Sequence, residues 1–170
     1  MDTNAITIDV ASAEEAGELL TLQRAAYLSE AQAYGDPYLP PLTETLDGLR
    51  AALAGGSVAL TGRLSGRLVG VVRVRVDGDT CHIGRLAVAP DLQGRGIGSL
   101  LLTETERRYA YGVTRFELFT GDRSAANLRL YARHGYVEFA RRPAGSHTLV
   151  YLEKGSAAPG LSGVSGSLSG

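Results

Sequence analysis

The chain has 170 residues, with 17 Lys and Arg against 18 Asp and Glu, which gives a formal net charge of −1. This length fits one domain, and a near-neutral charge without a basic run argues against nucleic acid as a partner. A single cysteine excludes an internal disulfide and a multi-cysteine metal site, so no metal is expected. The apolar runs are too short for a membrane span, which predicts a cytoplasmic protein with no membrane partner.

Hydrophobic periodicity and turn residues predict helices and strands along the first 153 residues. Ser12 and Glu15 form a capping box that opens the first helix, and the prolines within Ser29–Thr43 exclude one regular helix there. Short turns containing Gly66 and Gly78 join three valine-rich strands into an antiparallel meander. The predicted strands are Ile6–Val10, Ser57–Arg63, Arg67–Val76, Thr80–Val88, Thr114–Thr120, Tyr136–Arg141 and Ser146–Glu153, and the predicted helices are Ser12–Tyr27, Glu44–Ala54, Ile97–Tyr109 and Ser124–His134.

Glycine is unusually frequent, at 22 of 170 residues where about 7% is ordinary usage. Glycine and serine dominate residues 155–170, which predicts a domain over residues 1–154 followed by a flexible tail. Three more glycines alternate in Gln93–Gly98, between a predicted strand and a predicted helix. A glycine-rich turn at a helix start presents unpaired backbone N–H groups at the positive end of the helix dipole, an arrangement that suits a phosphate.

Three interpretations of this turn compete. A plain loop gives no reason for three glycines entering a helix, since glycine destabilises helices. The second interpretation is the dinucleotide fingerprint G-x-G-x-x-G, whose third glycine would have to stand at Ser99. That fingerprint also belongs to a βαβ unit, whereas this chain has a meander before the turn. In its favour, Glu117 lies at the spacing of the acid that binds the ribose. The third interpretation is binding of an acyl-CoA.

The segment Gln93–Gly98 matches the Q/R-x-x-G-x-G/A signature of the GNAT acetyltransferases, and Arg85–Pro90 is similar to the strand that precedes it in that family. About 30 residues downstream, Asn127–Tyr136 resembles the family's N-x-x-L-Y-x-x-x-G-F/Y segment. The resemblance covers residues 5–153. It implies an α/β (α+β) fold with a mixed, mostly antiparallel sheet of six to seven strands, helices on both faces, and the strands Thr80–Val88 and Thr114–Thr120 parallel and splayed.

The resemblance also implies where acetyl-CoA lies. The strand backbone at Leu86, Ala87 and Val88 would pair with the pantetheine arm, while the side chains of Leu86 and Val88 would point into the core. The N–H groups of the turn would bind the pyrophosphate, with the Ser99 hydroxyl as a further donor. Asn127 would bond the cofactor amide, or stabilise its helix start instead. The implied cofactor-binding residues are Leu86, Ala87, Val88, Gln93, Gly94, Arg95, Gly96, Ile97, Gly98, Ser99 and Asn127, with a plain surface charge as the alternative for Arg95.

Two residues are candidates for acid–base chemistry. Tyr131 matches the tyrosine that protonates the departing thiolate in many members, and a usual pKa of about 10 keeps it protonated; a buried aromatic on a helix face is the alternative. His82 falls where histone-type members carry a glutamate and could accept the proton of the amine; a packed strand histidine is the alternative. Glu117 is a second candidate base. Phe119 stands where members that acetylate peptide N-termini have a glutamate, which argues against a ribosomal-protein substrate.

The tyrosine-rich segment is predicted to form the acceptor wall through Tyr27, Tyr34 and Tyr38, and Cys81 is interpreted as structural. The resulting hypothesis is an N-acetyltransferase that moves an acetyl group from acetyl-CoA to a primary amine of a small molecule or protein by direct attack. One alternative is a non-catalytic module that binds or senses acyl-CoA. Another is acetylation of aminoacyl-tRNA, which the net charge disfavours. Pairing through the C-terminal strands would give a homodimer.

Overall fold

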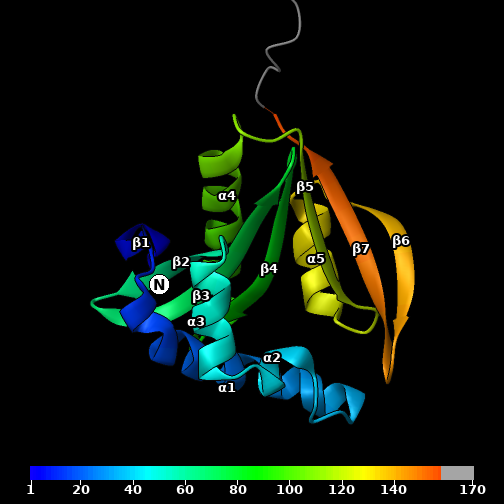
Figure 1. Ribbon diagram of the computed structural model, residues 1–170, viewed down its shortest axis with the longest axis horizontal. Coiled ribbons are helices and arrows are strands. Elements are labelled where there is room, and N and C mark those ends of the chain that lie inside the picture. Colours follow the sequence, from blue (N-terminus) through cyan, green and yellow to red (C-terminus); the bar gives the residue numbers. More distant parts are fainter. Residues whose placement is uncertain (158–170) are drawn as a thin grey trace, which may run out of the picture.

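A seven-stranded mixed sheet organises residues 1–157, the part of the chain that the computed structural model describes (Figure 1). Its strand order is β1-β2-β3-β4-β5-β7-β6, and every neighbouring pair is antiparallel except β4 and β5. The predicted mixed sheet is therefore confirmed. The strands are β1 (Ile6–Val10), β2 (Val58–Leu64), β3 (Arg67–Asp77), β4 (Thr80–Val88), β5 (Arg115–Gly121), β6 (Val137–Ala144) and β7 (His147–Gly155).

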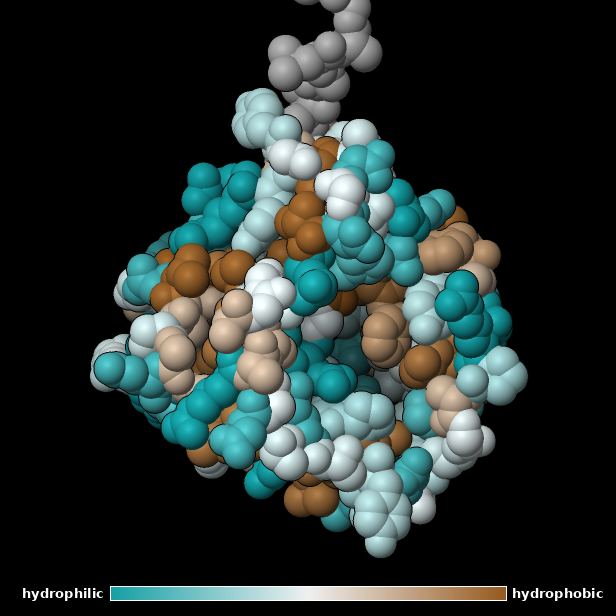
Figure 2. Space-filling model, in the orientation of Figure 1, coloured by the Kyte–Doolittle hydropathy of each residue, from teal (hydrophilic) through white to brown (hydrophobic). Residues whose placement is uncertain are grey.

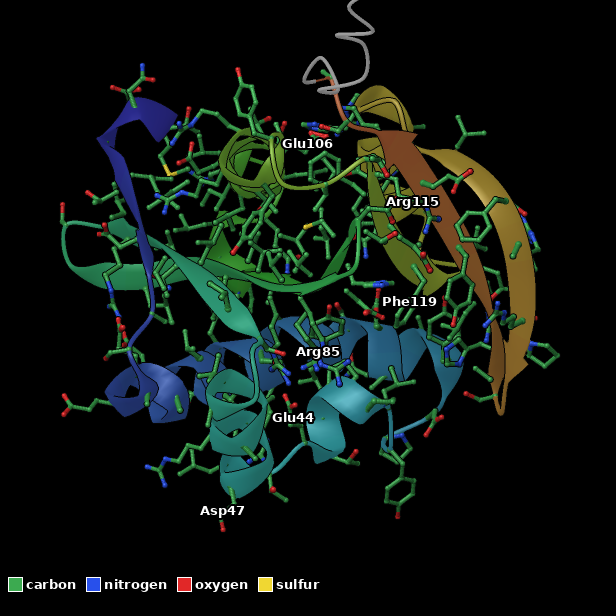
Figure 3. All side chains as sticks on the ribbon, turned by 45° about the horizontal axis from the view of Figure 1, so that its top comes forward. Glu44, Asp47, Arg85, Glu106, Arg115 and Phe119 are labelled. Carbon is green, nitrogen blue, oxygen red and sulfur yellow. The ribbon has the colours of Figure 1, made fainter. Side chains whose placement is uncertain are left out.

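Helices cover both faces of this sheet, as Figure 3 shows for β2 to β4, which run between two helical layers. One layer holds α1 (Ala16–Tyr34), α2 (Pro40–Thr43) and α3 (Leu46–Ala54), and the other holds α4 (Ile97–Tyr109) and α5 (Ala125–Arg133). Single 3₁₀ turns precede β1, α1 and α4, at Thr3–Ala5, Ala13–Glu15 and Pro90–Leu92. No helix within residues 1–157 has both the length and the apolar character that crossing a membrane requires.

The first helix differs from its predicted extent. The predicted capping box is present, because the backbone N–H of Ser12 donates to Glu15 Oε2 at 2.6 Å. The helix continues to Tyr34, seven residues beyond the predicted end, since no proline interrupts it before Gly35, whose φ of +61° ends it. The proline-bearing segment then forms only the short α2. This extension places Glu30 and Tyr34 on a rigid helix beside β4.

The core fills both faces of the sheet, and on the α4 side a glycine allows a close approach. A Cβ on Gly70 of β3 would lie 2.8 Å from Leu101 Cδ1 and 2.9 Å from Ile97 Cγ2, and both of those side chains are buried. A larger residue at this position would force buried side chains of α4 to move, which costs stability in a packed core. The contact anchors the first turn of α4 directly against the sheet.

The parallel pair of strands separates after three residues. Thr80–His82 of β4 pair with Arg115–Glu117 of β5, and beyond that point β5 pairs only with β7 on its other side. Figure 1 shows β4 and β5 diverging from this junction. The predicted splay of two parallel strands is therefore confirmed. It leaves one edge of β4 unpaired toward Val88 and opens the sheet at its centre.

The C-terminal boundary also differs from the prediction. Gly155, the first residue of the predicted tail, closes β7 and lies opposite Arg115 of β5. Ser156 follows it and donates from Oγ to the carbonyl oxygen of Ala110 at 2.6 Å. The rest of the predicted tail, from residue 158, lies outside the described residues.

Candidate active site

Two cavities meet where the strands diverge, and Figure 2 shows the molecule hollowed near the middle of this face. The turn cavity, about 480 Å³, lies between the end of β4, the residues Gly94–Ser99 and α5. The strand cavity, about 670 Å³, lies between the β3–β4 face, the helices α1 and α2, and the strands β5 and β7. The side chains that line both are Tyr27, Glu30, Tyr34, Leu86 and Asn127. Molecules bound in the two cavities would therefore touch.

The turn cavity is rich in free backbone donors. Within the described residues, the N–H groups from Gly94 to Ser99 donate no hydrogen bond, and the first bond of α4 runs from Leu100 N to Gly96 O at 3.0 Å. Gly94 and Gly96 have φ angles of +74° and +87°, which side chains rarely adopt. These donors surround the positive end of the α4 dipole. The turn predicted for a phosphate thus has the geometry of an anion site.

The side chains of Leu86 and Val88 pack against the core and also border the turn cavity. Both are partly buried, and both lie beside Gly98 of α4. Val88 pairs with Gly70, which lies against α4, so these two side chains face the part of the core between the sheet and α4. Ala87, between them, is buried and points to the opposite face of the sheet.

Two carbonyl groups of this strand already have partners. The Tyr27 hydroxyl donates to Leu86 O at 3.1 Å, and Gln93 Nε2 donates to Val88 O at 3.3 Å. Both donors are side chains rather than a paired strand, so an incoming ligand strand can displace them. Tyr27 and Gln93 therefore mark the unpaired edge of β4.

The polar residues of the turn are placed unequally. Arg95 is exposed and lines neither cavity. Ser99 lines the turn cavity, and its Oγ lies 2.7 Å from His134 Nε2, a partner that sequence reasoning missed. Burial lowers the pKa of His134. When the neutral imidazole carries its proton on Nε2, it donates to Ser99, and the serine hydroxyl stays available for an anion.

Tyr131 lies in the strand cavity, where it is 5% exposed. Its hydroxyl has no hydrogen-bond partner within residues 1–157. Burial raises its pKa, and the charges of Tyr27 and Glu30 act in the same direction. The phenol is therefore protonated at neutral pH and has its proton free to donate.

The two candidate bases differ in access. His82 lines the strand cavity, where it lies opposite Arg75 of β3. Glu117 lies opposite His82 in the parallel ladder but lines neither cavity, and Arg115 Nη1 donates to its Oε2 at 2.8 Å. Of the two, His82 alone faces the space in which an amine would sit.

The three tyrosines predicted for the acceptor wall, Tyr27, Tyr34 and Tyr38, all line the strand cavity. Tyr34 is buried, and its hydroxyl accepts from Arg123 N at 3.0 Å and lies 3.2 Å from Ser124 Oγ. Tyr38 is 78% exposed, so it belongs to the rim. Tyr27 and Tyr34 are therefore anchored by hydrogen bonds, and Tyr38 faces solvent.

A carboxylate that the sequence did not single out lies where the cavities meet. Glu30 Oε1 accepts from Ser124 Oγ at 2.8 Å and from Asn127 Nδ2 at 3.3 Å. Asn127 also donates to Thr120 Oγ1 at 3.3 Å, so its amide holds Glu30 and β5 in addition to facing the predicted cofactor site. Glu30 belongs to no motif and is 97 residues from Asn127, so only the fold brings them together.

The floor of the strand cavity is held by an ion pair. Glu44 accepts from Arg73 at 2.6 and 2.8 Å and from Gln23 Nε2 at 3.0 Å, and both charged side chains are 14% exposed. These donors, Arg73 first, lower the pKa of Glu44 to about 2. Because the pKa of Glu44 is lower in the folded state than in the unfolded state, its ionisation stabilises the protein above about pH 4.5. This contribution to the free energy of unfolding is lost as the pH falls toward 2.

We expect Glu44→Gln to lower the free energy of unfolding by about 3 kcal/mol at pH 7, because it leaves Arg73 without its buried partner. The difference from the parent should shrink as the pH falls from 4.5 to 2, where Glu44 itself becomes protonated. Urea unfolding of the parent and the variant at a series of pH values measures the loss at pH 7 and its change with pH. Asp47→Asn is the control, because the Asp47 side chain is 98% exposed. A difference that stays constant with pH would contradict the assignment.

Residues 1–157 contain one cysteine and His, Asp and Glu side chains of the types that bind metal ions. No group of three His, Cys, Asp or Glu within residues 1–157 is arranged to hold a metal ion. Cys81 is fully buried in the core, lines neither cavity, and has its pKa raised to about 12 by burial. A thiol in that state is not a nucleophile.

Comparison with known proteins shows which family has this architecture. A family model described as the acetyltransferase (GNAT) family matches residues 18–136. The ribosomal-protein-S18-alanine N-acetyltransferase of Escherichia coli is 17% identical, with a TM-score of 0.77 over 92% of this chain and 97% of that chain. YncA, a putative acetyltransferase of Salmonella typhimurium solved with its cofactor acetyl-CoA, is 23% identical, with a TM-score of 0.68 over 93% of this chain and 99% of that chain.

The PaiA N-acetyltransferase of Thermoplasma acidophilum, solved in complex with coenzyme A, is 18% identical, with a TM-score of 0.69 over 86% of this chain and 97% of that chain. A search of curated proteins found no match. At these identities the solved structures share the fold, whereas the family model matches the sequence itself over most of its length. The chain belongs to the GNAT acetyltransferase family.

Proposed function

We propose that the protein is an N-acetyltransferase that transfers the acetyl group of acetyl-CoA to a primary amine. The observation that carries the proposal is the turn cavity. It is lined by free backbone N–H groups, and it adjoins the strand cavity. Structural neighbours solved with coenzyme A or acetyl-CoA support the choice of donor.

The residues present fit this donor. The N–H groups from Gly94 to Ser99 suit a pyrophosphate, because several backbone donors at a helix start bind phosphate oxygens. The unpaired edge of β4 at Leu86–Val88 suits the amide groups of a pantetheine arm, which would take the positions now held by Tyr27 and Gln93. A thioester at the end of that arm would enter the region shared by the two cavities.

The strand cavity supplies the groups that the transfer needs. The amine nitrogen attacks the thioester carbonyl, so that a C–N bond forms and the C–S bond breaks. Tyr131 gives its proton to the departing sulfur, and His82 accepts the proton that the amine loses. A proton passed from His82 through water restores the phenol, so the products are the amide and the free thiol of CoA.

The proposal is tested first by binding and then by turnover. We expect calorimetry to show binding of acetyl-CoA and none of NAD, and a panel of primary amines to release free CoA with at least one member. Binding of NAD alone would refute acetyl transfer. Tight binding of acetyl-CoA without CoA release from any amine would indicate a module that binds acyl-CoA without catalysis.

A further inference from the structure

The strand cavity contains an arginine whose side chain makes no hydrogen bond to an anion within the described residues. Arg85 lines this cavity, its side chain is 26% exposed, and its Nε is buried without any hydrogen bond. Its two terminal nitrogens also make no hydrogen bond within residues 1–157. Figure 3 shows Arg85 between the sheet and the α1–α2 layer, above Glu44. A partly buried cation in this state needs an explanation, since such groups are normally hydrogen-bonded.

The nearest carboxylate does not meet that need. Glu44 Oε1 lies 3.9 Å from Arg85 Nε, beyond hydrogen-bond range, while the same carboxylate accepts three shorter bonds from Arg73 and Gln23. Burial lowers the pKa of Arg85, which is the sign of an incompletely compensated charge. Glu44 is therefore committed to Arg73, and Arg85 remains available.

The charged groups that line the strand cavity are divided between its two sides. Arg75 donates only to Gly55 O, at 3.1 Å, and so adds a second uncompensated cation. The acids are Glu30, held by Ser124 and Asn127, and Asp36, held by Tyr38 N and Ser146 on the rim. The floor on β3 and β4 is thus positive, and negative charge lies across the cavity on α1 and the loop after it.

The backbone places Arg85 close to the reaction centre. Arg85 sits at a register shift between β3 and β4 with a φ of +50°, an uncommon conformation for a residue with a side chain. It directly precedes Leu86, which lines both cavities. An anion bound by Arg85 would therefore lie beside the region that the two cavities share. Strained backbone that aims a side chain into a cavity is typical of functional sites.

We propose that the acceptor is an amino acid, whose carboxylate binds the Arg85 guanidinium while its amino group faces the thioester. This inference rests on the proposed acetyl transfer and names its substrate class. A guanidinium matches a carboxylate with two parallel hydrogen bonds, and both terminal nitrogens of Arg85 are free to make them. Glu30, across the cavity, supplies the opposite charge for the ammonium end. A polyamine would instead place a second cation against Arg85 and Arg75.

The test measures binding of amines to the protein saturated with CoA. The twenty standard amino acids are titrated by calorimetry, and each acid that binds is compared with the amine that lacks its carboxylate. We expect at least one acid to bind about tenfold or more tighter than its amine, as one charge-assisted pair provides. Arg85→Gln should remove this difference, Arg85→Lys should restore part of it, and Arg50→Gln, on the exposed face of α3, should keep it.

The outcomes separate this inference from the proposed function. If CoA binds and plain amines release it, yet no acid binds tighter than its amine, the acceptor class is wrong and acetyl transfer stands. An unchanged preference in Arg85→Gln would equally overturn the role of Arg85. If neither CoA nor acetyl-CoA binds, the proposed transfer is refuted. The affinities of each amino acid and of the amine that lacks its carboxylate are then compared on the free protein. Equal affinities there would refute the carboxylate site at Arg85.

Discussion

Replacing Gly96 with valine is expected to lower the affinity for acetyl-CoA by about 100-fold or more while the protein stays folded. Gly96 has a φ of +87°, which a β-branched side chain cannot adopt without strain, so the turn must change its backbone angles. That change redirects the N–H groups of Gly96, Ile97 and Gly98, which have no other partner in the described chain. Losing two hydrogen bonds to a charged group costs about 3 kcal/mol or more, which corresponds to about 100-fold in affinity.

Gly78→Val is the matched control for this variant. Gly78 has a φ of +59° in the turn between β3 and β4, and it lines neither cavity. It therefore carries a comparable strain without a role in binding. Calorimetry with acetyl-CoA and a thermal melt on both variants distinguish the two effects. If Gly96→Val binds acetyl-CoA as tightly as Gly78→Val does, the turn does not hold the pyrophosphate.

Local sequence signals predicted most of the fold. The alternation of valines in β3, the glycine turns on either side of it and the capping box at Ser12 each act within a few residues, and each is found in the structure. The end of α1 was harder to predict, because the residues after Tyr27 have helical propensity but no periodic pattern, and packing decides how far such a helix continues.

The candidate site was predictable where a motif runs along the backbone and less so where side chains meet across the fold. The turn at Gly94–Ser99 and the position of Tyr131 follow from short motifs, and both lie at cavities. Glu30 reaches its partners only because the fold brings the end of α1 to the start of α5. Arg85 has no hydrogen-bonded carboxylate because Glu44 is engaged by Arg73. No local pattern encodes that Arg73, rather than Arg75 or Arg85, takes the hydrogen bonds of Glu44.

The direction of the side chains on β4 illustrates the same limit. A two-residue period fixes that Leu86 and Val88 share a face, but the register shift between β3 and β4 decides which face that is. Both faces of a central strand are covered, so hydrophobic character does not distinguish them. Here Leu86 and Val88 lie beside Gly98 of α4, and the small Ala87 points to the opposite face.

The second large effect is expected from Tyr131→Phe, which should lower kcat about 100-fold or more and leave the affinity for acetyl-CoA unchanged. The hydroxyl is the proton donor proposed for the departing thiolate, and general acids contribute about this much. Because burial raises the pKa of Tyr131, the phenol is protonated across the range from about pH 6 to 9. The ratio of the two kcat values should therefore be the same at every pH in that range.

Stability separates this role from a structural one. The Tyr131 hydroxyl has no hydrogen-bond partner within residues 1–157, so its removal should leave the melting temperature unchanged or raised. Tyr136→Phe is the matched control, because Tyr136 is equally buried and its ring centroid lies 6.1 Å from that of Tyr131. The Tyr136 hydroxyl donates to Glu106 at 3.4 Å, and the residue lines neither cavity. That variant should lose stability and keep its kcat. Equal kcat values for Tyr131→Phe and the parent with an accepted amine would show that the thiolate takes its proton from another source.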